Sequence, residues 1–209
     1  MTFWDDILKG ITGEYLDIGC YDETLYSNTK LVSLAGWKGI AVDANPDVKT
    51  KWLTNRPLDI FYNLAVADSI SNQADQDSHL KFYRFQDGAV NTIQKTVAKG
   101  WIERGFPFKD VIKVKSLTLE EIAYRIKEDN PSFTPRLVNI DIEQANYLPC
   151  LQNFISAMRH PQLLCIEWVN SGFGINNFKE SDEVKILESC SYEVVQLIGG
   201  NIFAQHKGK

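Results

Sequence analysis

The chain has 209 residues, of which 44% are hydrophobic and 23% are charged. This length suits one domain with a substantial core, and the composition excludes a disordered or collagen-like chain. The formal net charge of -5 and the scattered basic residues argue against nucleic acid as a partner.

The first half of the chain predicts a β-α-β-α-β unit, which is typical of a parallel sheet with right-handed crossovers. Short apolar runs that end at glycine or aspartate alternate with segments of helical pattern. The expected elements are a strand at 14–19, a capped helix at 27–35, a strand at 39–43, a helix that starts after Pro46 and ends near Arg56, and a strand at 60–67.

The middle of the chain is less regular. Residues 68–78 are polar and predict an exposed, mobile loop, while 80–85 and 111–115 alternate as half-buried strands do. The segment between these strands contains Gly88, Gly100, Gly105 and Pro107. We expect residues 68–116 to form a loop-rich insertion or lid on the substrate side.

The second half continues the alternation. It predicts helices at 119–128, 147–158 and 180–190, strands at 137–142 and 163–168, and a final hairpin of strands 193–197 and 201–205 around Gly199 and Gly200. The fold class expected for the single domain 1–209 is therefore α/β and Rossmann-like. Its sheet should be doubly wound and mostly parallel, with an antiparallel C-terminal edge strand.

Cysteine usage and the N-terminus favour a cytoplasmic protein. The four cysteines are widely spaced without a CxxC pair, which favours reduced thiols. The first residues lack the basic and apolar regions of a signal peptide, and no apolar run approaches the roughly 18 residues of a membrane span. We therefore expect no membrane partner.

Acidic residues end the first two predicted strands, where ligands bind in an open parallel sheet. Asp17 can accept hydrogen bonds from an ammonium group, and Gly19 allows the backbone to approach a ligand closely. Asp43 can accept both hydroxyls of a ribose. Either acid alone is more often a helix cap or a solvated strand end, but two at successive strand ends favour an amino-acid-bearing nucleoside cofactor.

Several motifs in this order resemble the FkbM-type methyltransferases. They are Tyr15-Leu16-Asp17-Ile18-Gly19, Tyr26-Ser27-Asn28-Thr29, Gly36-Trp37-Lys38-Gly39-Ile40, Asp43-Ala44-Asn45-Pro46, Asn63-Leu64-Ala65-Val66-Ala67-Asp68 and Asp141-Ile142-Glu143. The resemblance covers roughly residues 14–168. It implies a class I methyltransferase fold, S-adenosylmethionine as cofactor and O-methyl transfer to a small-molecule acceptor, often a sugar, a glycoconjugate or another hydroxylated compound.

The resemblance also implies a set of cofactor-binding residues. The methionine part would be surrounded by Asp17, Gly19, Tyr21, Ser27 and Asn28. The ribose would be held by Asp43, and the adenine would be flanked by Asn63, Ala65 and Val66.

Departures from the family pattern leave a second hypothesis open. Glu23 replaces a usual glycine, and Gln144 and Asn146 replace a glycine and a glutamate. The chain could therefore be a degenerate cofactor-binding or scaffold protein. A third hypothesis, a nicotinamide-dependent oxidoreductase, is weak because the sequence lacks a GxGxxG motif.

Three acids are candidates for a general base that accepts the proton of an alcohol. Asp141 and Glu143 stand on one face at the end of the strand predicted at 137–142, and Glu167 stands at the end of the strand predicted at 163–168. Asp141 is the first choice. The same acids could bind Mg²⁺, or could simply cap helices and bond within loops.

Overall fold

The computed structural model of the chain describes residues 12–67, 79–142, 147–168 and 175–208. Glu143, Gln144, Asn146 and the polar loop predicted at 68–78 lie outside these ranges. Within them, no helix combines the length and the apolar character that crossing a membrane requires.

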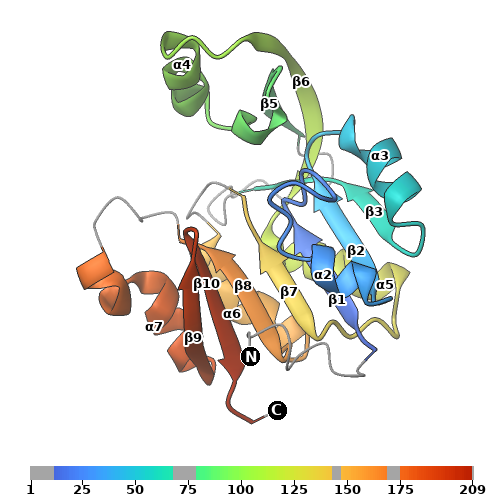
Figure 1. Ribbon diagram of the computed structural model, residues 1–209, viewed down its shortest axis with the longest axis vertical. Helices are drawn as coiled ribbons and strands as arrows, with labels where there is room; N and C mark the ends of the chain where they lie inside the picture. Colours follow the sequence, from blue (N-terminus) through green and yellow to red (C-terminus); the bar gives the residue numbers. More distant parts are fainter. Residues whose placement is uncertain (1–11, 68–78, 143–146, 169–174, 209) are drawn as a thin grey trace.

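A seven-stranded sheet forms the centre of the molecule (Figure 1). Its strands, from one edge to the other, are β3 (Ile60–Asn63), β2 (Lys38–Asp43), β1 (Glu14–Ile18), β7 (Leu137–Ile140), β8 (Leu163–Glu167), β10 (Asn201–His206) and β9 (Tyr192–Ile198). The first five are parallel, and β10 runs antiparallel to both of its neighbours. The hairpin between β9 and β10 turns at Gly199 and Gly200, whose φ angles of 58° and 86° suit a two-residue turn.

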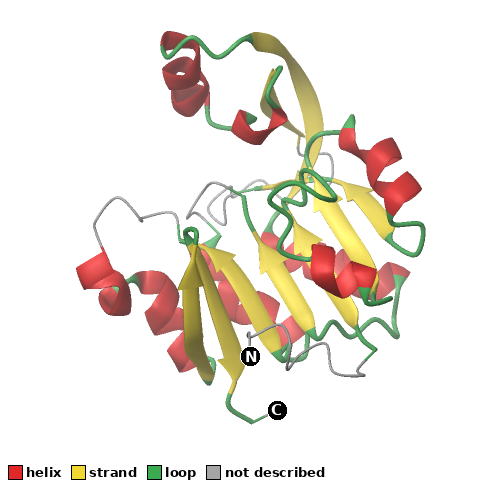
Figure 2. Cartoon of the chain, viewed as in Figure 1, coloured by secondary structure: helices red, strands yellow, loops and turns green. Residues whose placement is uncertain are grey.

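Helices cover both faces of this sheet (Figure 2). One face carries α2 (Lys30–Leu34) and α3 (Val48–Asn55), and the other carries α5 (Leu119–Asp129), α6 (Leu148–Ala157) and α7 (Asp182–Ser189), which η3 (Ile175–Glu180) precedes. Side chains of a strand alternate between the faces. Leu16 and Ile18 therefore join the core under α5 to α7, whereas Tyr15 packs toward α2. The structure confirms the doubly wound, Rossmann-like α/β class.

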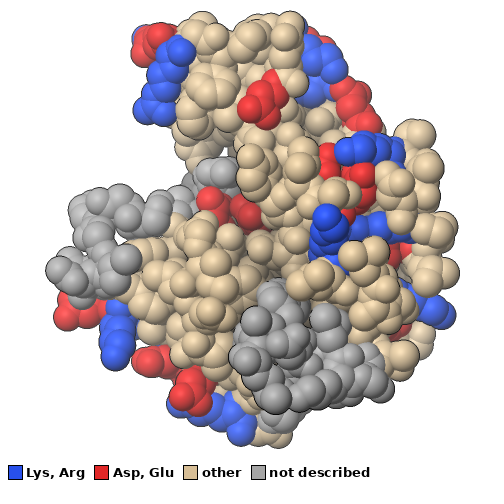
Figure 3. Space-filling model, viewed as in Figure 1, with Lys and Arg blue, Asp and Glu red and all other residues tan. Residues whose placement is uncertain are grey.

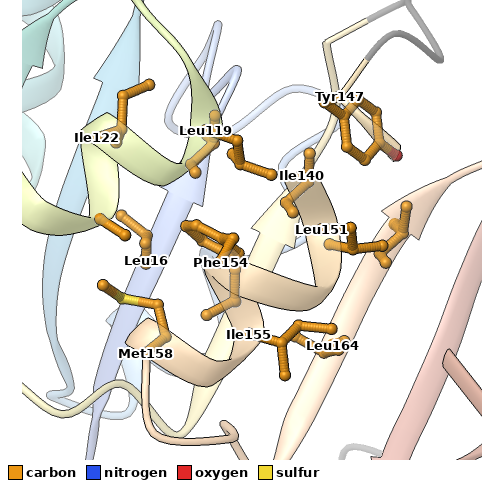
Figure 4. Close-up of a cluster of buried hydrophobic side chains, with 14 of the residues drawn as sticks. Leu16, Leu119, Ile122, Ile140, Tyr147, Leu151, Phe154, Ile155, Met158 and Leu164 are labelled. Carbon is orange, nitrogen blue, oxygen red and sulfur yellow. The ribbon is translucent and has the colours of Figure 1, made fainter. Parts of the chain in front are cut away.

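The larger core lies between the sheet and the helices α5 and α6 (Figure 4). Phe154, Ile155 and Met158 of α6 and its C-cap are fully buried against Leu16, Ile140 and Leu164 of the strands. At about 25 cal/mol per Å² of apolar area, this burial supplies most of the stabilisation of the fold.

Residues 79–117 form an arm that rises from the carboxyl end of the sheet (Figure 1). The arm contains β5 (His79–Phe85), η1 (Gly88–Val90), α4 (Lys95–Glu103) and β6 (Phe108–Leu117). The two strands expected here are present as an antiparallel pair. The segment between them, expected to be loop-rich, instead holds the helix α4, which tolerates Gly100 in its interior.

The single strand expected at 60–67 is divided in two. Leu64 donates its backbone NH to the carbonyl of Asp43 at 3.0 Å, and the chain then leaves the main sheet. The short strand β4 (Ala65–Val66) pairs instead with β6 in a separate sheet of order β4-β6-β5. A continuous apolar run does not show where a strand changes sheets, so the sequence pattern could not reveal this break.

Candidate functional site

A cavity of about 250 Å³ lies where the carboxyl ends of β1, β2 and β7 meet the arm. We call it the main cavity. In the space-filling view, a hollow separates the arm from the body, and the charged side chains of the arm gather mostly on its outer edges (Figure 3). The lining residues are Asp17–Tyr21, Leu25–Asn28, Val42–Asn45, Leu64–Val66, Phe82, Gly88, Ala89, Asn91–Gln94, Asn139, Asp141 and Ile142.

Most of the residues proposed for cofactor binding lie together on this wall. The structure brings Asp17, Gly19, Tyr21, Ser27, Asn28, Asp43, Ala65 and Val66 to the main cavity. Asn63 is the exception: it is exposed and does not line the cavity. Its amide donates to the carbonyls of Asp43 and Ala44 at 2.8 and 3.0 Å, so it supports the backbone below the cavity.

Gly19 makes the tight turn after β1. Its φ of +79° lies in the left-handed region, and a Cβ there would stand 1.8 Å from the carbonyl oxygen of Asp141. Only glycine fits this contact. Its NH donates to the carbonyl of Val42 at 2.8 Å, so the turn is wedged between β2 and the chain that follows β7.

Asp43 is buried at the end of β2 with an exposed fraction of 9%. Its two carboxylate oxygens accept the backbone NH groups of Tyr21 and Asn45 at 2.8 and 2.7 Å. Burial raises the pKa of this carboxyl from 3.8 to about 6, because the charged form is poorly solvated. Each oxygen keeps a further lone pair with which it can accept a hydroxyl.

Asp17 faces inward, on the same side of β1 as Tyr15. One of its oxygens accepts the hydroxyl of Thr29 and the other accepts the amide of Asn139 at 2.8 Å. Burial raises the pKa of the carboxyl. Asn139 in turn accepts from the amide of Asn28 at 3.1 Å. Asp17 therefore connects β7 to the loop that precedes α2.

A buried arginine, which the sequence analysis did not identify, joins this network. The guanidinium of Arg56 donates to Thr29 Oγ1 and Ser27 Oγ at 2.8 Å and to the carbonyl of Glu23 at 2.6 Å. It stacks 4.1 Å from the ring centroid of Trp52. The sequence pattern indicates Arg56 only as the end of a helix. The signal for a buried network is Asn139, a polar residue inside an apolar strand.

Glu23 does not enter the main cavity. Its carboxylate accepts from the amide of Asn55 at 2.8 Å and pairs with Lys51 at 3.3 Å. The side chain is therefore turned toward α3, where it anchors the loop after β1. A side chain at this position, where the family pattern has glycine, could crowd the cofactor or point outward, and the structure shows that it points outward.

The three acids proposed as catalytic residues differ in position. Asp141 lines the main cavity, and its NH donates to the carbonyl of Ile18 at 2.9 Å. Glu167 ends β8 without lining this cavity, and Glu143 lies outside the described residues. Within the described parts of the chain, no group of three or more His, Cys, Asp or Glu side chains is arranged to hold a metal ion.

The contacts that fasten the arm over the main cavity include a packing contact of Gly88 and ion pairs of Arg84 and Lys109 with Asp47. Gly88 packs against the ring of Tyr21, where a Cβ would come within 2.9 Å of the ring. Arg84 donates to both oxygens of Asp110, at 2.7 and 2.6 Å, and to Asp47 beside α3 at 2.8 Å. Because Phe82 and residues 88–94 line the cavity, these contacts keep a wall of the site in place.

Comparisons with known proteins give likenesses to solved structures. No family model matches the chain, and no curated protein matches it. The fibrillarin pre-rRNA processing protein of Methanococcus jannaschii is 10% identical, with a TM-score of 0.46, over 95% of this chain and 68% of that one. A TehB-like SAM-dependent methyltransferase of Corynebacterium glutamicum is 12% identical, with a TM-score of 0.39, over 92% and 77% of the two chains.

Proposed function

We propose that this chain binds S-adenosylmethionine in the main cavity and transfers the methyl group to a hydroxyl of a small molecule, such as a sugar. The observation that carries the proposal is the division of the cavity wall. Apolar side chains lie at one part, polar side chains lie at another, and the buried carboxylate of Asp43 ends β2. An adenosine joined to an amino acid needs these three surfaces.

Each part of the wall has a distinct role in this proposal. Leu64, Val66 and Phe82 would hold the adenine. Asp43 would accept the ribose hydroxyls, and the polar end would receive the amino-acid part; its members are Asp17, Ser27, Asn28 and Asn139. The FkbM resemblance rests on the residue pattern and supports the same arrangement.

The bound cofactor would supply an electrophilic methyl group on a sulfonium. The protein has to align the acceptor oxygen with that carbon and exclude water. Asp141 borders the cavity and would accept the proton of the acceptor hydroxyl as the new oxygen–carbon bond forms and the carbon–sulfur bond breaks. The Gly19 contact fixes the backbone of Asp141, which limits where its carboxylate can reach.

Calorimetry with S-adenosylmethionine and S-adenosylhomocysteine tests the cofactor, and a panel of hydroxylated acceptors tests transfer. We expect binding of both nucleosides and methyl transfer that falls by about a hundredfold or more in Asp141→Asn. Absence of binding at millimolar ligand would refute the proposal. Binding without transfer to any acceptor would favour the scaffold alternative, whose argument from Glu23 is removed by the position of that side chain.

A further inference from the structure

The arm at residues 79–117 carries a charge opposite to that of the rest of the chain. It holds eight Lys and Arg residues against three Asp and Glu residues, which gives a net charge of +5. The other residues hold 14 Lys and Arg against 24 Asp and Glu, which gives -10. The arm is therefore a positive extension of an acidic body (Figure 1), and such a separation of charge favours binding to an anionic surface.

Strand pairing gathers part of this charge on one face of the arm. Lys81 of β5 stands directly opposite Lys113 of β6, and His79 stands opposite Lys115. Residues directly opposite each other, and residues two positions apart in a strand, share a face. Lys81, Lys113 and Lys115 are exposed, and we call them the lysine face. Val111 continues this face toward the far end of the arm.

The reverse face of the same pair of strands is apolar and covered. Phe82 stands opposite Ile112, and both pack with Val114 in one cluster. Phe82 also lines the main cavity. The lysine face therefore points away from the main cavity and is an outer surface of the arm.

The charge of the lysine face is not neutralised by the described parts of the chain. Like charges at directly opposite positions destabilise a pair of strands. Arg84 and Lys109, elsewhere on the arm, form ion pairs with Asp47. By contrast, no Asp or Glu side chain in the described ranges forms an ion pair with the three lysines of the lysine face. An anion from outside the chain would relieve their repulsion.

The far end of the arm also exposes apolar side chains. The helix α4 and the start of β6 lie there (Figure 1). Val97 and Ile102 of α4 and Phe108 and Val111 of β6 have exposed fractions of 37%, 49%, 42% and 44%. A soluble polyanion such as a nucleic acid strand gains little from these side chains. An anionic lipid surface accepts both kinds of group, because its headgroups attract lysine and the layer beneath them receives apolar side chains.

We propose that the arm docks onto an anionic lipid surface. Its far end enters the interface with Ile102 and Phe108, and the lysine face lies against the headgroups. This contact needs no spanning helix, whereas the expectation of no membrane partner follows from the lack of a spanning run in the sequence. The inference is independent of the proposed function. Because the arm forms one wall of the main cavity, its docking brings that cavity to the lipid surface.

The test is co-sedimentation of the full chain with two kinds of vesicle, one of phosphatidylcholine alone and one that also contains phosphatidylserine. Each lysine near an anionic surface strengthens binding by about fivefold, so three should give a preference of about a hundredfold for the vesicles with phosphatidylserine at low ionic strength. Added salt should reduce this preference. Equal binding to the two kinds of vesicle, or no binding to either, would overturn the proposal.

A pair of triple variants tests whether the lysine face produces the preference. In the first variant, glutamine replaces all three lysines of the lysine face, and the preference should be lost. The control has the same net charge but loses three exposed lysines of the body: Lys49→Gln, Lys179→Gln and Lys185→Gln. It should keep the preference. Equal losses in the two variants would show that net charge acts and not the lysine face, which would overturn the assignment.

The apolar part of the contact has its own matched pair. Val111→Ser should weaken binding to the phosphatidylserine vesicles several-fold, because an exposed apolar side chain of the arm is removed. Val195→Ser should not, since Val195 has a similar exposed fraction of 43% but lies on β9 of the body. A single-stranded RNA that binds the lysine face more tightly than the vesicles and displaces them would assign the arm to nucleic acid and overturn the lipid proposal.

Discussion

The side chains around the main cavity and the carboxylate of Glu183 on α7 are both buried and polar, but among the described residues only the former are hydrogen-bonded. Asp17, Asp43 and Arg56 have exposed fractions of 1%, 9% and 4%, and each makes at least two hydrogen bonds to protein groups. The carboxylate of Glu183 is equally buried and accepts no hydrogen bond from any residue in the described ranges. The polar side chains around the main cavity are therefore organised by the fold itself, whereas the burial of Glu183 costs free energy that no hydrogen bond from a described residue offsets.

The largest loss of stability should come from Gly19→Ala, which alters the wall of the main cavity. The new Cβ would stand 1.8 Å from the carbonyl oxygen of Asp141 at a φ of +79°, so we expect a loss of about 3 kcal/mol or more of unfolding free energy in urea titrations. Gly36→Ala is the control, because Gly36 has a similar φ of +86° but a Cβ added there would meet no neighbouring atom within 4 Å. Similar losses in both variants would mean that backbone strain alone, and not the Asp141 contact, makes Gly19 necessary.

Arg56→Met should also be severe, because several buried acceptors lose their donor. We expect unfolding free energy to fall by about 3 kcal/mol, together with weaker S-adenosylhomocysteine binding from a displaced Ser27 loop. Arg125→Met, in exposed ion pairs on α5, should change stability by less than about 0.5 kcal/mol. Equal stability of the two variants would show that the network below the main cavity is dispensable.

Glu183→Met tests the unpartnered carboxylate and should stabilise the protein, whereas the two preceding substitutions should destabilise it. Replacing an unpartnered buried carboxylate by an apolar side chain of similar size should raise the unfolding free energy by about 1 kcal/mol. The matched change Glu188→Met on the exposed face of α7 should alter it by less than about 0.5 kcal/mol. A destabilised Glu183→Met protein would indicate that Glu183 supports the fold itself.

The smallest expected effect is a pH dependence set by Asp43. Its pKa of about 6 means that the carboxylate loses its charge, and an acceptor for ribose, as the pH falls through 6. S-adenosylhomocysteine affinity measured by calorimetry should therefore decrease below this pH by about threefold. Asp43→Asn should bind weakly with a flat profile over the same interval; an unchanged pH profile would exclude Asp43 as the titrating group.

The raised pKa of Asp43 affects the stability of the fold in the opposite direction to cofactor affinity: stability decreases as the pH rises. The folded chain holds the Asp43 proton more tightly than the unfolded chain, whose carboxyl has a pKa near 3.8. Stability contributed by this group is thus present below pH 3.8 and is lost as the pH rises through about 6. Thermal unfolding of the wild-type chain and Asp43→Asn over this interval should show the difference.

Much of the fold and part of the site could be predicted from the pattern of residues. Apolar runs ending at Asp17 and Asp43 located β1 and β2, and the Gly199-Gly200 pair located the last hairpin. Eight of the nine residues proposed for the cofactor line one cavity, because the carboxyl ends of parallel strands meet at one edge of the sheet. Asn63 differs because its amide bonds to backbone carbonyls of the neighbouring strand end.

Contacts between distant segments could not be predicted in this way. The direction of the Glu23 side chain depends on Asn55 and Lys51 of α3, and the role of Arg56 depends on a loop 27 or more residues earlier in the chain. The local pattern predicts a loop-rich segment where the structure has α4, because Gly100 and neighbouring turn residues have low helix propensity. Packing within the arm overrides that propensity.

The sequence by itself determined most strands and helices of the main sheet, the glycine turn after β1 and the acids at the strand ends, because these follow from local periodicity and backbone chemistry. Only the tertiary structure decided which polar groups are satisfied and which are not. Hydrogen bonds such as those of Asp17 with Thr29 and Asn139 join residues that are far apart in sequence, so partnership is a property of packing. The same packing leaves the carboxylate of Glu183, at the start of α7, without a hydrogen-bond donor in the part of the chain that the structure describes.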